Sequence, residues 1–600
     1  MKAYSNIAAA VFALLLLASS ASAYTTHINA PAVVFGQDTG ILTTVSLNVT
    51  HGNGNVTIKG PRIVNISTLE SAQAAAAYAS YFVGVNEKDY NFTYTIYNAS
   101  NVSGPSGGLA MTMLAVAALQ GRQLPENFTA TGTINQDGTV GEIGGVYDKA
   151  AAAASKGMHY ILVPYVYPGS FENELYYISQ QLFGIKVIEV MNVSQALGYV
   201  YGKLYLSPVS YNVTEYYHLA SLQQANLTCT ACNMSAFAEL EGFTLNLTNA
   251  TIESAPEQLS GLKQSMLGQE AKFAQIAAKG YLYAASDLSF LLYDNAYTIA
   301  ASANITTASA NIMISNLTSY CSSLTPPQMT NLNYEYVIGG ELRQSWGSIY
   351  AGIAGQQLAS SQSSDGLIEA INTAGKASGW CQAASKMYSI ASSLGGQPVA
   401  LNSSIKADAQ KAISQSSSFN SDNLYYQSAV NNYKEENYGA ALYAMSYAMA
   451  IYGSAYSMHN ETLLMGNLSN FTYGAWPTQF ALQARFYQNE AMLTGNQSEN
   501  ESAFYVAMLA KLLSSDNRLI TASFYNVSVN STAQQNYNAI ESQVQAVQQQ
   551  IQNVYVLLLA ILVILLIILL MLFVVLLRPY TRKQAEASGN SGRRTRRNHA

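Results

Sequence analysis

The chain has 600 residues, of which only 10% are charged, and its formal net charge is −6 at pH 7. A protein that binds nucleic acid through phosphate contacts carries an excess of Lys and Arg, so this balance excludes that class. The length predicts more than one domain.

The first residues have the pattern of a secretory signal peptide. Lys2 precedes an apolar stretch from Ile7 to Leu17, and Ala21-Ser22-Ala23 is a small-residue cleavage pattern. We therefore expect the mature protein to begin near Tyr24. The segment is too short and too poorly flanked to be a permanent membrane anchor.

A glycine-rich turn around Ser106 precedes an apolar segment. In Gly104-Pro105-Ser106-Gly107-Gly108, the glycines allow a tight turn and a close approach to a ligand. Residues 109–119 predict a helix whose N-terminal amides can receive an oxyanion. A serine hydroxyl is a poor nucleophile at neutral pH and needs a base within hydrogen-bond reach. Ser106 is the candidate nucleophile, supported by Gly104 and Gly107.

A second glycine turn leads into a helix that carries the candidate base. Gly144 and Gly145 precede Lys149, which opens the alanine-rich stretch 150–154. On the buried side of such a helix, a lysine loses its proton more readily than in water. Lys156, near the end of the same helix, suits a solvated cation and is expected to be structural.

Each motif alone is more often structural than catalytic, because Gly-Pro-Ser is a common turn and Gly-Gly before a lysine is a common helix junction. The order of the motifs along the chain is what favours a catalytic role. The segment from about Gly40 to Gly202 resembles the proteolytic domain of Lon-type (S16-like) serine/lysine peptidases. The resemblance rests on five blocks: Glu70-Ser71-Ala72, Gly104–Gly108, Thr131-Gly132, Gly144–Lys149 and Ile161–Pro164.

In that family the serine and the lysine are separated as Ser106 and Lys149 are here, by 43 residues. The resemblance implies that Ser106 attacks the peptide carbonyl, that Lys149 takes its proton, and that Thr131 helps to orient the lysine. It also implies an α+β Lon-type fold for this domain. Four glycines are expected to support the site: Gly104, Gly107, Gly144 and Gly145.

The sequence also departs from the family pattern. Ser103 stands where an acidic residue is usual, Gly107 replaces an alanine, Thr133 replaces a glutamate, and Tyr97 stands where a histidine is common. Because the candidate nucleophile and base are unchanged, we expect altered substrate preference or loop behaviour. The alternative is a non-catalytic cell-envelope binding module built on a degenerate Lon protease fold.

Composition changes after the Lon-like segment. Residues 212–552 are rich in Ala, Ser, Gln, Asn, Tyr and Leu and lack the alternation of strands, so they predict a mainly α-helical domain. Two stretches, 279–285 and 436–444, resemble tetratricopeptide hairpins, but no constant period links them. We expect an irregular helical array or bundle. His218 and His459 are isolated and expected to be structural.

The four cysteines lie in this helical region, at Cys229, Cys232, Cys321 and Cys381. An even number in an oxidising compartment predicts two disulfides. Two pairings stay open. Either Cys229 and Cys232 each bond to one of the later cysteines, or there is one tight bridge and one long one. A redox pair or a zinc half-site at Cys229 and Cys232 lacks the surroundings that either needs.

A short heptad seam follows, formed by Tyr537, Ile540, Val544, Val547 and Ile551. It predicts either an oligomer contact, as Lon-type domains assemble into rings, or packing against the protein's own helical domain.

Residues 554–577 form a run of 24 residues without a charge. At about 1.5 Å per residue, the run spans a hydrocarbon core of roughly 30 Å. Arg and Lys residues follow it at once, which predicts a cytoplasmic tail and a large extracytoplasmic part. We therefore expect five segments: a signal peptide (1–23), a Lon-type protease domain (24–205), a helical extracellular domain with the heptad seam (206–552), a transmembrane helix (553–577) and a basic tail (578–600).

More than twenty Asn-x-Ser/Thr patterns predict a glycoprotein. The phosphate-cradling pattern Gly-x-x-x-x-Gly-Lys-Ser/Thr does not occur, so we expect no use of ATP. These features predict a membrane-anchored, extracytoplasmic, ATP-independent serine endopeptidase that cleaves unfolded or flexible polypeptides, similar to exported archaeal relatives of Lon. The expected partners are a polypeptide substrate, the membrane and further copies of the chain, with no nucleic acid, cofactor or metal ion.

Overall fold

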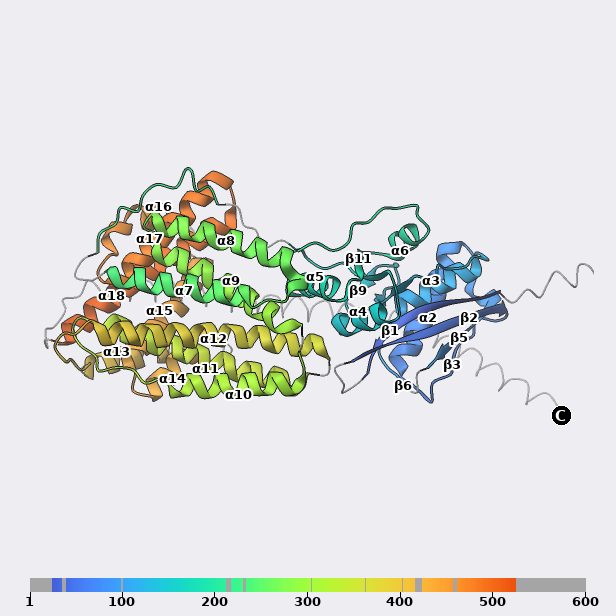
Figure 1. The fold of residues 1–600 in the computed structure, drawn as a ribbon, viewed down its shortest axis with the longest axis horizontal. Coiled ribbons are helices and arrows are strands. Elements are labelled where there is room, and N and C mark those ends of the chain that lie inside the picture. The colour runs from blue at the N-terminus through green and yellow to red at the C-terminus, as the bar shows by residue number, and fades with distance from the viewer. Residues whose placement is uncertain are drawn as a thin grey trace, which may run out of the picture.

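The computed structural model describes residues 24–34, 39–98, 101–211, 217–229, 234–303, 305–361, 363–401, 403–415, 423–456 and 461–524. Within these ranges a sheet domain is followed by a helical domain, and the two lie end to end (Figure 1). The expected signal peptide, heptad seam, transmembrane helix and basic tail fall in 1–23 and 525–600, outside the described residues. None of the described helices is long and apolar enough to cross a membrane.

A seven-stranded mixed sheet forms the middle of the first domain, in the order β11-β10-β7-β1-β2-β5-β3. Its strands are β1 (Tyr24–Val33), β2 (Gly40–His51), β3 (Val56–Lys59), β5 (Tyr90–Tyr97), β7 (Phe128–Ala130), β10 (Tyr160–Pro164) and β11 (Lys186–Val190). Successive residues of a strand point to opposite faces, so Val45, Leu47 and Val49 of β2 are buried together on one face.

Strand β1 joins an antiparallel part of the sheet to a parallel part. It pairs antiparallel with β2, whose Gly40 lies opposite Val33, and parallel with β7, where Thr129 lies opposite Asn29. Strands β10 and β11 continue the parallel part. Because β1 and β7 run in the same direction, the segments that follow them emerge at the same edge of the sheet.

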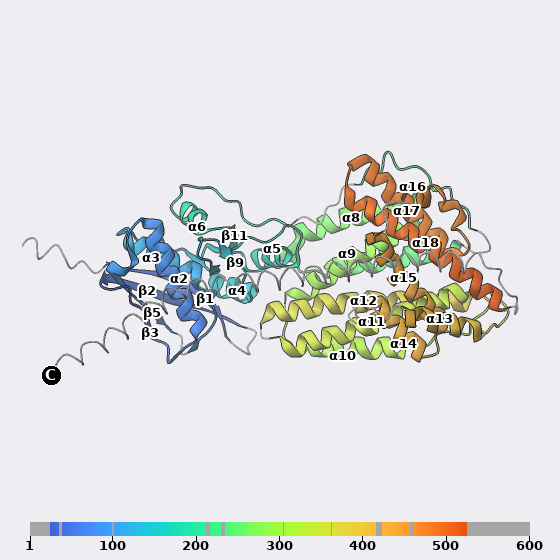
Figure 2. The ribbon, with the colours of Figure 1, turned by 180° about the vertical axis from the view of Figure 1, so that it is seen from behind.

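Helices cover both faces of this sheet. They are α2 (Ile66–Val83), α3 (Gly108–Leu119) and α6 (Val193–Val200) on one face, and α4 (Val146–Ser155) and α5 (Phe171–Phe183) on the other. Leu162 and Ile188 of the strands pack with the first group, whereas Ile161 and Val187 pack with the second. Figures 1 and 2 show α4 and α5 on the side toward the helical domain.

Two short sheets lie beside the main one. β4 (Ile63–Val64) pairs with β6 (Asn101–Val102), and β8 (Thr133–Ile134) pairs with β9 (Val140–Gly141). Strand β6 leads directly into the turn that holds Ser106, and β9 precedes the second glycine turn. Both candidate turns therefore start from a paired strand.

The second domain is helical, as predicted. Its helices are α7 (Ser235–Glu253), α8 (Ser260–Ala278), α9 (Leu282–Ser302), α10 (Thr307–Ser323), α11 (Tyr334–Ser360), α12 (Ser364–Ser393), α13 (Ser403–Gln415), α14 (Leu424–Lys434), α15 (Tyr438–Tyr456), α16 (Glu461–Gly466), α17 (Ala475–Thr494) and α18 (Gln497–Phe524). The long helices α11 and α12 pack against each other. In the core, the buried guanidinium of Arg343 lies 4.2 Å from the ring centre of Trp476.

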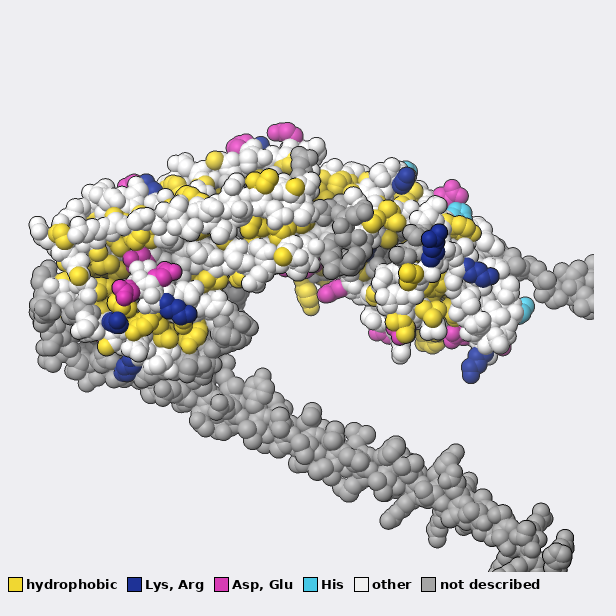
Figure 3. All heavy atoms as spheres, turned by 90° about the horizontal axis from the view of Figure 1, so that it is seen from below, with side chains coloured by type: hydrophobic (Ala, Val, Ile, Leu, Met, Phe, Trp, Pro, Cys, Tyr) yellow, Lys and Arg dark blue, Asp and Glu magenta, His cyan; other side chains and the backbone are white. Residues whose placement is uncertain are grey.

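The two domains share a hydrophobic core. Tyr147 and Leu175 of the sheet domain pack in one cluster with Leu259 and Ile368 of the helical domain. Seen from below, the surface bends inward between the domains, and charged side chains are few and scattered on this face (Figure 3). The sparse charge matches a sequence in which 10% of residues are charged.

A disulfide joins Cys321 of α10 to Cys381 of α12. Both helices pack on α11, which brings the two Cα atoms to 5.4 Å, within the range that a disulfide requires. Cys229 is also disulfide-bonded, and Cys232 lies outside the described residues. The pairing in which Cys229 and Cys232 each bond to one of the later cysteines is therefore wrong.

Candidate active site

Ser106 lies in the turn between β6 and α3 and is partly buried. Gly107 is the N-cap of α3, with a φ of −82°. Gly104 has a φ of 97°, which residues with a side chain rarely adopt. The glycine at this position therefore allows the chain to turn from β6 into α3.

Three hydroxyl groups hold the backbone of this turn. They donate to three consecutive carbonyls, from Thr68 to Gly104, from Ser71 to Pro105 and from Thr131 to Ser106, at 3.1, 3.1 and 3.2 Å. Thr68 and Ser71 share one face of α2 because they are three residues apart. Sequence reasoning missed this role for both residues, since the spacing gains meaning only when α2 lies beside the turn.

Two amides of the turn are left for another acceptor, while Gly108 N donates to Pro105 O at 3.0 Å. Gly132 N donates to Ser106 O at 2.9 Å, and Leu109 N donates to Gly132 O at 3.0 Å. Within the described part of the chain, no hydrogen bond uses the amide of Ser106 or of Gly107. Both amides lie at the N-terminus of α3, where free N–H groups and the helix dipole favour negative charge. They can stabilise the oxyanion that forms when a hydroxyl adds to a carbonyl.

Lys149 lies near the start of α4, and only 3% of its surface is exposed. Its Nζ donates to Gly144 O at 2.8 Å. Burial lowers the pKa of Lys149 to about 8, although the carboxylates of Asp365 and Asp148 favour its charged form. A neutral amine that donates one hydrogen to Gly144 O keeps its lone pair, so it can take a proton from a hydroxyl.

Gly145 fixes the start of α4 against the sheet. It is the N-cap of the helix, with a φ of 73°, and a Cβ there would lie 2.2 Å from Cγ2 of Val33. Because Gly145 has no side chain, the first turn of α4 can lie directly against Val33 at the end of β1. Lys156, at the other end of α4, is exposed, as predicted.

Ser106 and Lys149 reach the same edge of the sheet from opposite faces. The Ser106 carbonyl is bonded to Thr131 and Gly132 at the end of β7, and α4 starts against Val33 at the end of β1. These two strand ends are neighbours because β1 and β7 pair in parallel. None of the described hydrogen bonds joins Ser106 Oγ to Lys149 Nζ, and the Thr131 hydroxyl bonds to Ser106 rather than to the lysine.

The helix that carries the candidate base is also bonded to the helical domain. Val146 N and Tyr147 N donate to the two carboxylate oxygens of Asp365 at 2.8 and 2.9 Å. Asp148 Oδ2 accepts a hydrogen bond from Ser364 N at 2.9 Å. Sequence reasoning gave no sign of these contacts, because Asp365 lies 219 residues from Val146 along the chain.

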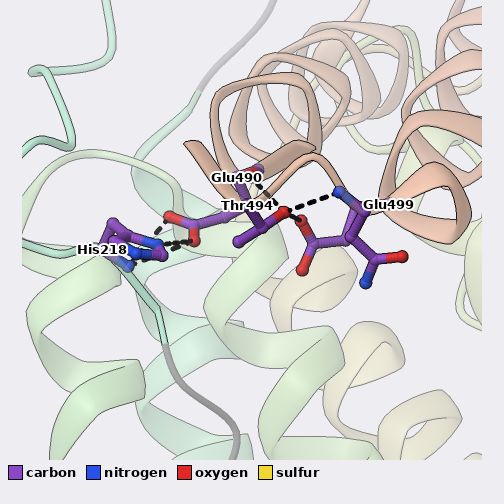
Figure 4. A network of polar contacts seen from close by, with 5 residues as sticks. His218, Glu490, Thr494 and Glu499 are labelled. Carbon is purple, nitrogen blue, oxygen red and sulfur yellow. Dashed lines mark hydrogen bonds and ion pairs between the residues drawn. The ribbon is translucent and has the colours of Figure 1, made fainter. Parts of the chain in front are cut away.

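His218, which the sequence predicts to be isolated, has a buried partner in Glu490. His218 N donates to Glu490 Oε2 at 3.1 Å, and His218 Nδ1 lies 3.1 Å from the same oxygen (Figure 4). Thr494 Oγ1 lies 2.8 Å from Glu490 O and 3.0 Å from Glu499 Oε2, and its single hydrogen can be donated to either. This network ties the segment that precedes α7 to α17.

Two further features of the described residues concern metal ligands and hollows. No group of three His, Cys, Asp or Glu among the described residues could hold a metal ion. A hollow of about 570 Å³ in the helical domain is lined by Leu227, Met234 and Leu282, among others. The described residues of its lining include no acid or base, and Cys229 among them is disulfide-bonded.

Residues 29–199 match the family model of the Lon protease (S16) C-terminal proteolytic domain. This segment is a Lon-type proteolytic domain. It is similar to the Lon protease of Finegoldia magna, with 32% identity over 133 residues that cover 21% of this chain and 17% of the relative. It is also similar to Lon protease 2 of Bacillus subtilis, with 30% identity over 115 residues that cover 19% of this chain and 20% of the relative.

The Lon-type match is confined to the first domain. The matched segments make up a fifth or less of the Lon proteases of Finegoldia magna and Bacillus subtilis. The resemblance that the glycine turns predicted is confirmed at the level of the domain.

Proposed function

We propose that the Lon-type domain is a serine peptidase in which Ser106 is the nucleophile and Lys149 is the general base. The observation that carries the proposal is the burial of Lys149, which lowers its pKa to about 8. At pH 7 about a tenth of such amines are neutral, far more than for a lysine in water. The hydroxyl-bonded turn of Ser106 and the two amides at the start of α3 support the proposal.

The first half of the reaction forms an ester. Ser106 Oγ bonds to the carbonyl carbon of the substrate while its proton passes to Lys149 Nζ. The carbonyl oxygen becomes an oxyanion, which accepts hydrogen bonds from the amides of Ser106 and Gly107. The carbon–nitrogen bond then breaks, and the leaving amine takes the proton from Lys149. The acyl part of the substrate remains on Ser106.

Water completes the reaction. It attacks the ester carbon and gives a proton to Lys149, the bond to Ser106 Oγ breaks, and the proton returns to the serine oxygen. Gly144 O, 2.8 Å from Nζ, keeps the lysine hydrogen-bonded in both of its charge states. Thr131 acts on the nucleophile in this mechanism, because its hydroxyl holds the carbonyl of Ser106.

The proposed substrates are unfolded or flexible polypeptides, and the proposed hydrolysis needs no ATP. The 600 residues contain no phosphate-cradling pattern that would indicate a nucleotide-driven unfolding motor. Without such a motor, the backbone of a folded protein reaches the site only through rare local opening.

The proposed location is the outer face of a cell membrane, as for an exported, single-pass archaeal protein. Three sequence features support it: the signal pattern in 1–23, the uncharged run 554–577 with its basic flank, and the many N-glycosylation patterns. The disulfide between Cys321 and Cys381 fits an oxidising compartment. Cleavage of the helical domain by protease added to intact cells tests this location; a domain protected until lysis would contradict it.

A non-catalytic binding module is the second candidate. The observation that favours it is that Lys149 Nζ is bonded to Gly144 O, while no described hydrogen bond connects it to Ser106 Oγ. In this second candidate, the hydrogen bond to the main-chain carbonyl is the whole role of Lys149, and the lysine takes no proton from Ser106. The two candidates therefore differ in whether Ser106 reacts.

One experiment separates the two candidates. The purified protein is mixed with unfolded casein without nucleotide, and separately with a fluorophosphonate probe, over roughly pH 6 to 9. The peptidase predicts new casein termini and covalent labelling of Ser106, both identified by mass spectrometry. The binding module predicts that casein is retained intact and that Ser106 stays unlabelled throughout the pH range.

A further inference from the structure

Helix α4, which carries Lys149, is capped by the other domain. Its N-cap residue is Gly145, which has no side chain to accept the first amides of the helix. Asp365 of α12 takes this role, because its two oxygens accept hydrogen bonds from Val146 N and Tyr147 N at 2.8 and 2.9 Å. A carboxylate at this position is stabilised by unpaired amides and by the helix dipole.

The capping is reciprocal. Asp148 of α4 accepts a hydrogen bond from Ser364 N, the first amide of α12, at 2.9 Å. The side chain of Ser363, the N-cap of α12, is bonded to a different amide, that of Gly366. The two helices therefore exchange carboxylates across the domain boundary, and each domain completes a helix of the other. Figure 1 shows one end of α12 directed at α4.

Tyr147 strengthens the same junction. Its hydroxyl donates to Ser302 O of the helical domain at 2.7 Å, and its ring packs edge-on against Phe183 with centroids 4.8 Å apart. Val146, Tyr147 and Asp148 are thus all bonded to the helical domain. Since Lys149 follows them directly, its backbone cannot shift without breaking these contacts.

Asp365 also bears on the charge of the base. Burial raises the pKa of Asp365 to about 6; its hydrogen bonds to two amides and the charge of Lys149 lower it, and the carboxylate of Asp148 raises it. Asp365 is therefore mostly ionised at neutral pH. Asp365 and Asp148 both favour the charged form of Lys149, against the effect of burial on its pKa. The other titratable groups that interact with Asp365 are Tyr147 and, on α5, Tyr176.

We propose that Asp365 is a positioning residue of the catalytic site, through which the helical domain holds α4 and influences the charge of Lys149. The inference rests on the proposed function, because Asp365 is proposed to act on Lys149, the general base of that function. It makes the helical domain part of the catalytic unit. Separation of the two domains would remove both the cap of α4 and a carboxylate near the base.

The test compares full-length Asp365→Asn with Glu369→Gln as the matched control. Glu369 is an exposed carboxylate four residues further along α12, so its removal changes the charge of the same helix without touching α4. The first readout is the pH dependence of Lys149 acetylation by acetic anhydride, followed by mass spectrometry. The second is amide hydrogen exchange of the segment 144–155. Neither readout requires hydrolysis.

Asp365→Asn is expected to lower the midpoint of Lys149 acetylation by roughly 0.5 to 1 pH unit, because a carboxylate that favours the ammonium is lost. The acidic limb of peptide hydrolysis should move by the same amount, and exchange in 144–155 should become faster. Glu369→Gln should leave all three unchanged. Asp365→Glu keeps the charge, so its acetylation midpoint for Lys149 should lie close to that of the wild type. A merely structural role of Asp365 would not predict this.

An unchanged acetylation midpoint in Asp365→Asn, or an equal shift in Glu369→Gln, would overturn the inference. If Asp365→Asn does not fold, Asp365→Ser removes the carboxylate and keeps a side-chain oxygen that can accept from a helix amide. A lower acetylation midpoint of Lys149 then supports the inference, and an unchanged midpoint overturns it. If Asp365→Asn shifts the acetylation midpoint of Lys149 but the wild type hydrolyses no peptide, only the proposed peptidase function is rejected. If the wild type hydrolyses peptide but Asp365→Asn leaves the midpoint unchanged, only the role of Asp365 is rejected.

Discussion

Thr131 donates its side-chain hydrogen bond to the backbone carbonyl of Ser106 at 3.2 Å, and Gly132 N donates to the same carbonyl at 2.9 Å. The family resemblance implies that Thr131 acts on the lysine, whereas its hydroxyl here holds the nucleophile turn. Thr131 is fully buried at the end of β7, so water cannot replace the hydroxyl as donor. The position of Ser106 therefore depends on this contact.

Replacing Thr131 by Val keeps the shape of the side chain and removes the donor. We expect kcat/KM to fall roughly tenfold, because the loss of a hydrogen bond worth about 1 kcal/mol loosens the nucleophile turn. Thr129→Val is the matched control: Thr129 is equally buried and donates to Asn29 O at 2.7 Å, away from the turn. Equal losses of activity in the two variants would refute a specific role for Thr131.

Lys149 determines the expected pH dependence of hydrolysis. Its neutral amine is the base and its pKa is lowered to about 8, so kcat/KM should rise with pH and level off above about pH 8. Lys149→Arg should be inactive throughout, because a guanidinium stays protonated. Initial rates on an unstructured fluorogenic peptide measure the profile. A plateau that is already reached near pH 6 would show that another group is the base.

Gly145 and Gly157 flank α4 and both have left-handed backbone, with φ values of 73° and 75°. A Cβ at Gly145 would lie 2.2 Å from Val33 Cγ2, whereas a Cβ at Gly157 would meet nothing within 4 Å. Gly157→Ala should therefore cost about 1 kcal/mol of unfolding free energy through strain alone, and Gly145→Ala about 2–3 kcal/mol. Denaturant unfolding measures both costs; equal values would mean that the contact with Val33 is unimportant.

Several buried carboxyl groups make stability depend on pH. Burial raises the pKa of five of them to about 7 or 8: Glu174 and Glu270 to about 7, and Asp294, Glu341 and Asp516 to about 8. In the unfolded chain such groups ionise near about pH 4. Between these values the native state holds protons that the unfolded state has lost. Stability should therefore fall as pH rises, by about 1.4 kcal/mol per pH unit for each such proton.

Thermal unfolding at about pH 5 and at about pH 8 tests whether stability falls as the pH rises. We expect a clearly lower midpoint at the higher pH, and a smaller drop in Asp294→Asn, whose carboxyl is buried with Oδ1 unpaired. A midpoint that stays constant or rises with pH would contradict the account. Since Lys149 needs a higher pH to be neutral, activity and stability should respond to pH in opposite directions.

The local chemistry of the site could be read from the sequence. The glycines before Ser106 and Lys149 predicted two turns that lead into helices. Helix α3 begins within a residue of the predicted start, whereas α4 begins at Val146, three residues before Lys149. The apolar stretch 109–119 and the alanines after Lys149 predicted these two helices. These features are local, because turn geometry and helix formation depend on residues a few positions apart.

The contacts between distant segments could not be predicted. Asp365 meets Val146 across 219 residues, and no pattern near either residue distinguishes a carboxylate that caps another domain from one that faces solvent. The choice of Cys321 and Cys381 as partners likewise follows from the packing of α10 and α12 on α11. In both cases three-dimensional packing decides which groups meet.

Hydrolysis of unfolded casein without nucleotide, by the full-length protein and three variants, tests the central claim most directly. Ser106→Ala and Lys149→Met should each lower the rate by at least about a thousandfold, because nucleophile and base act as a unit. Lys156→Met, which alters the exposed lysine at the far end of α4, should keep the full rate. Wild-type hydrolysis that persists in Ser106→Ala or in Lys149→Met would contradict the serine/lysine mechanism.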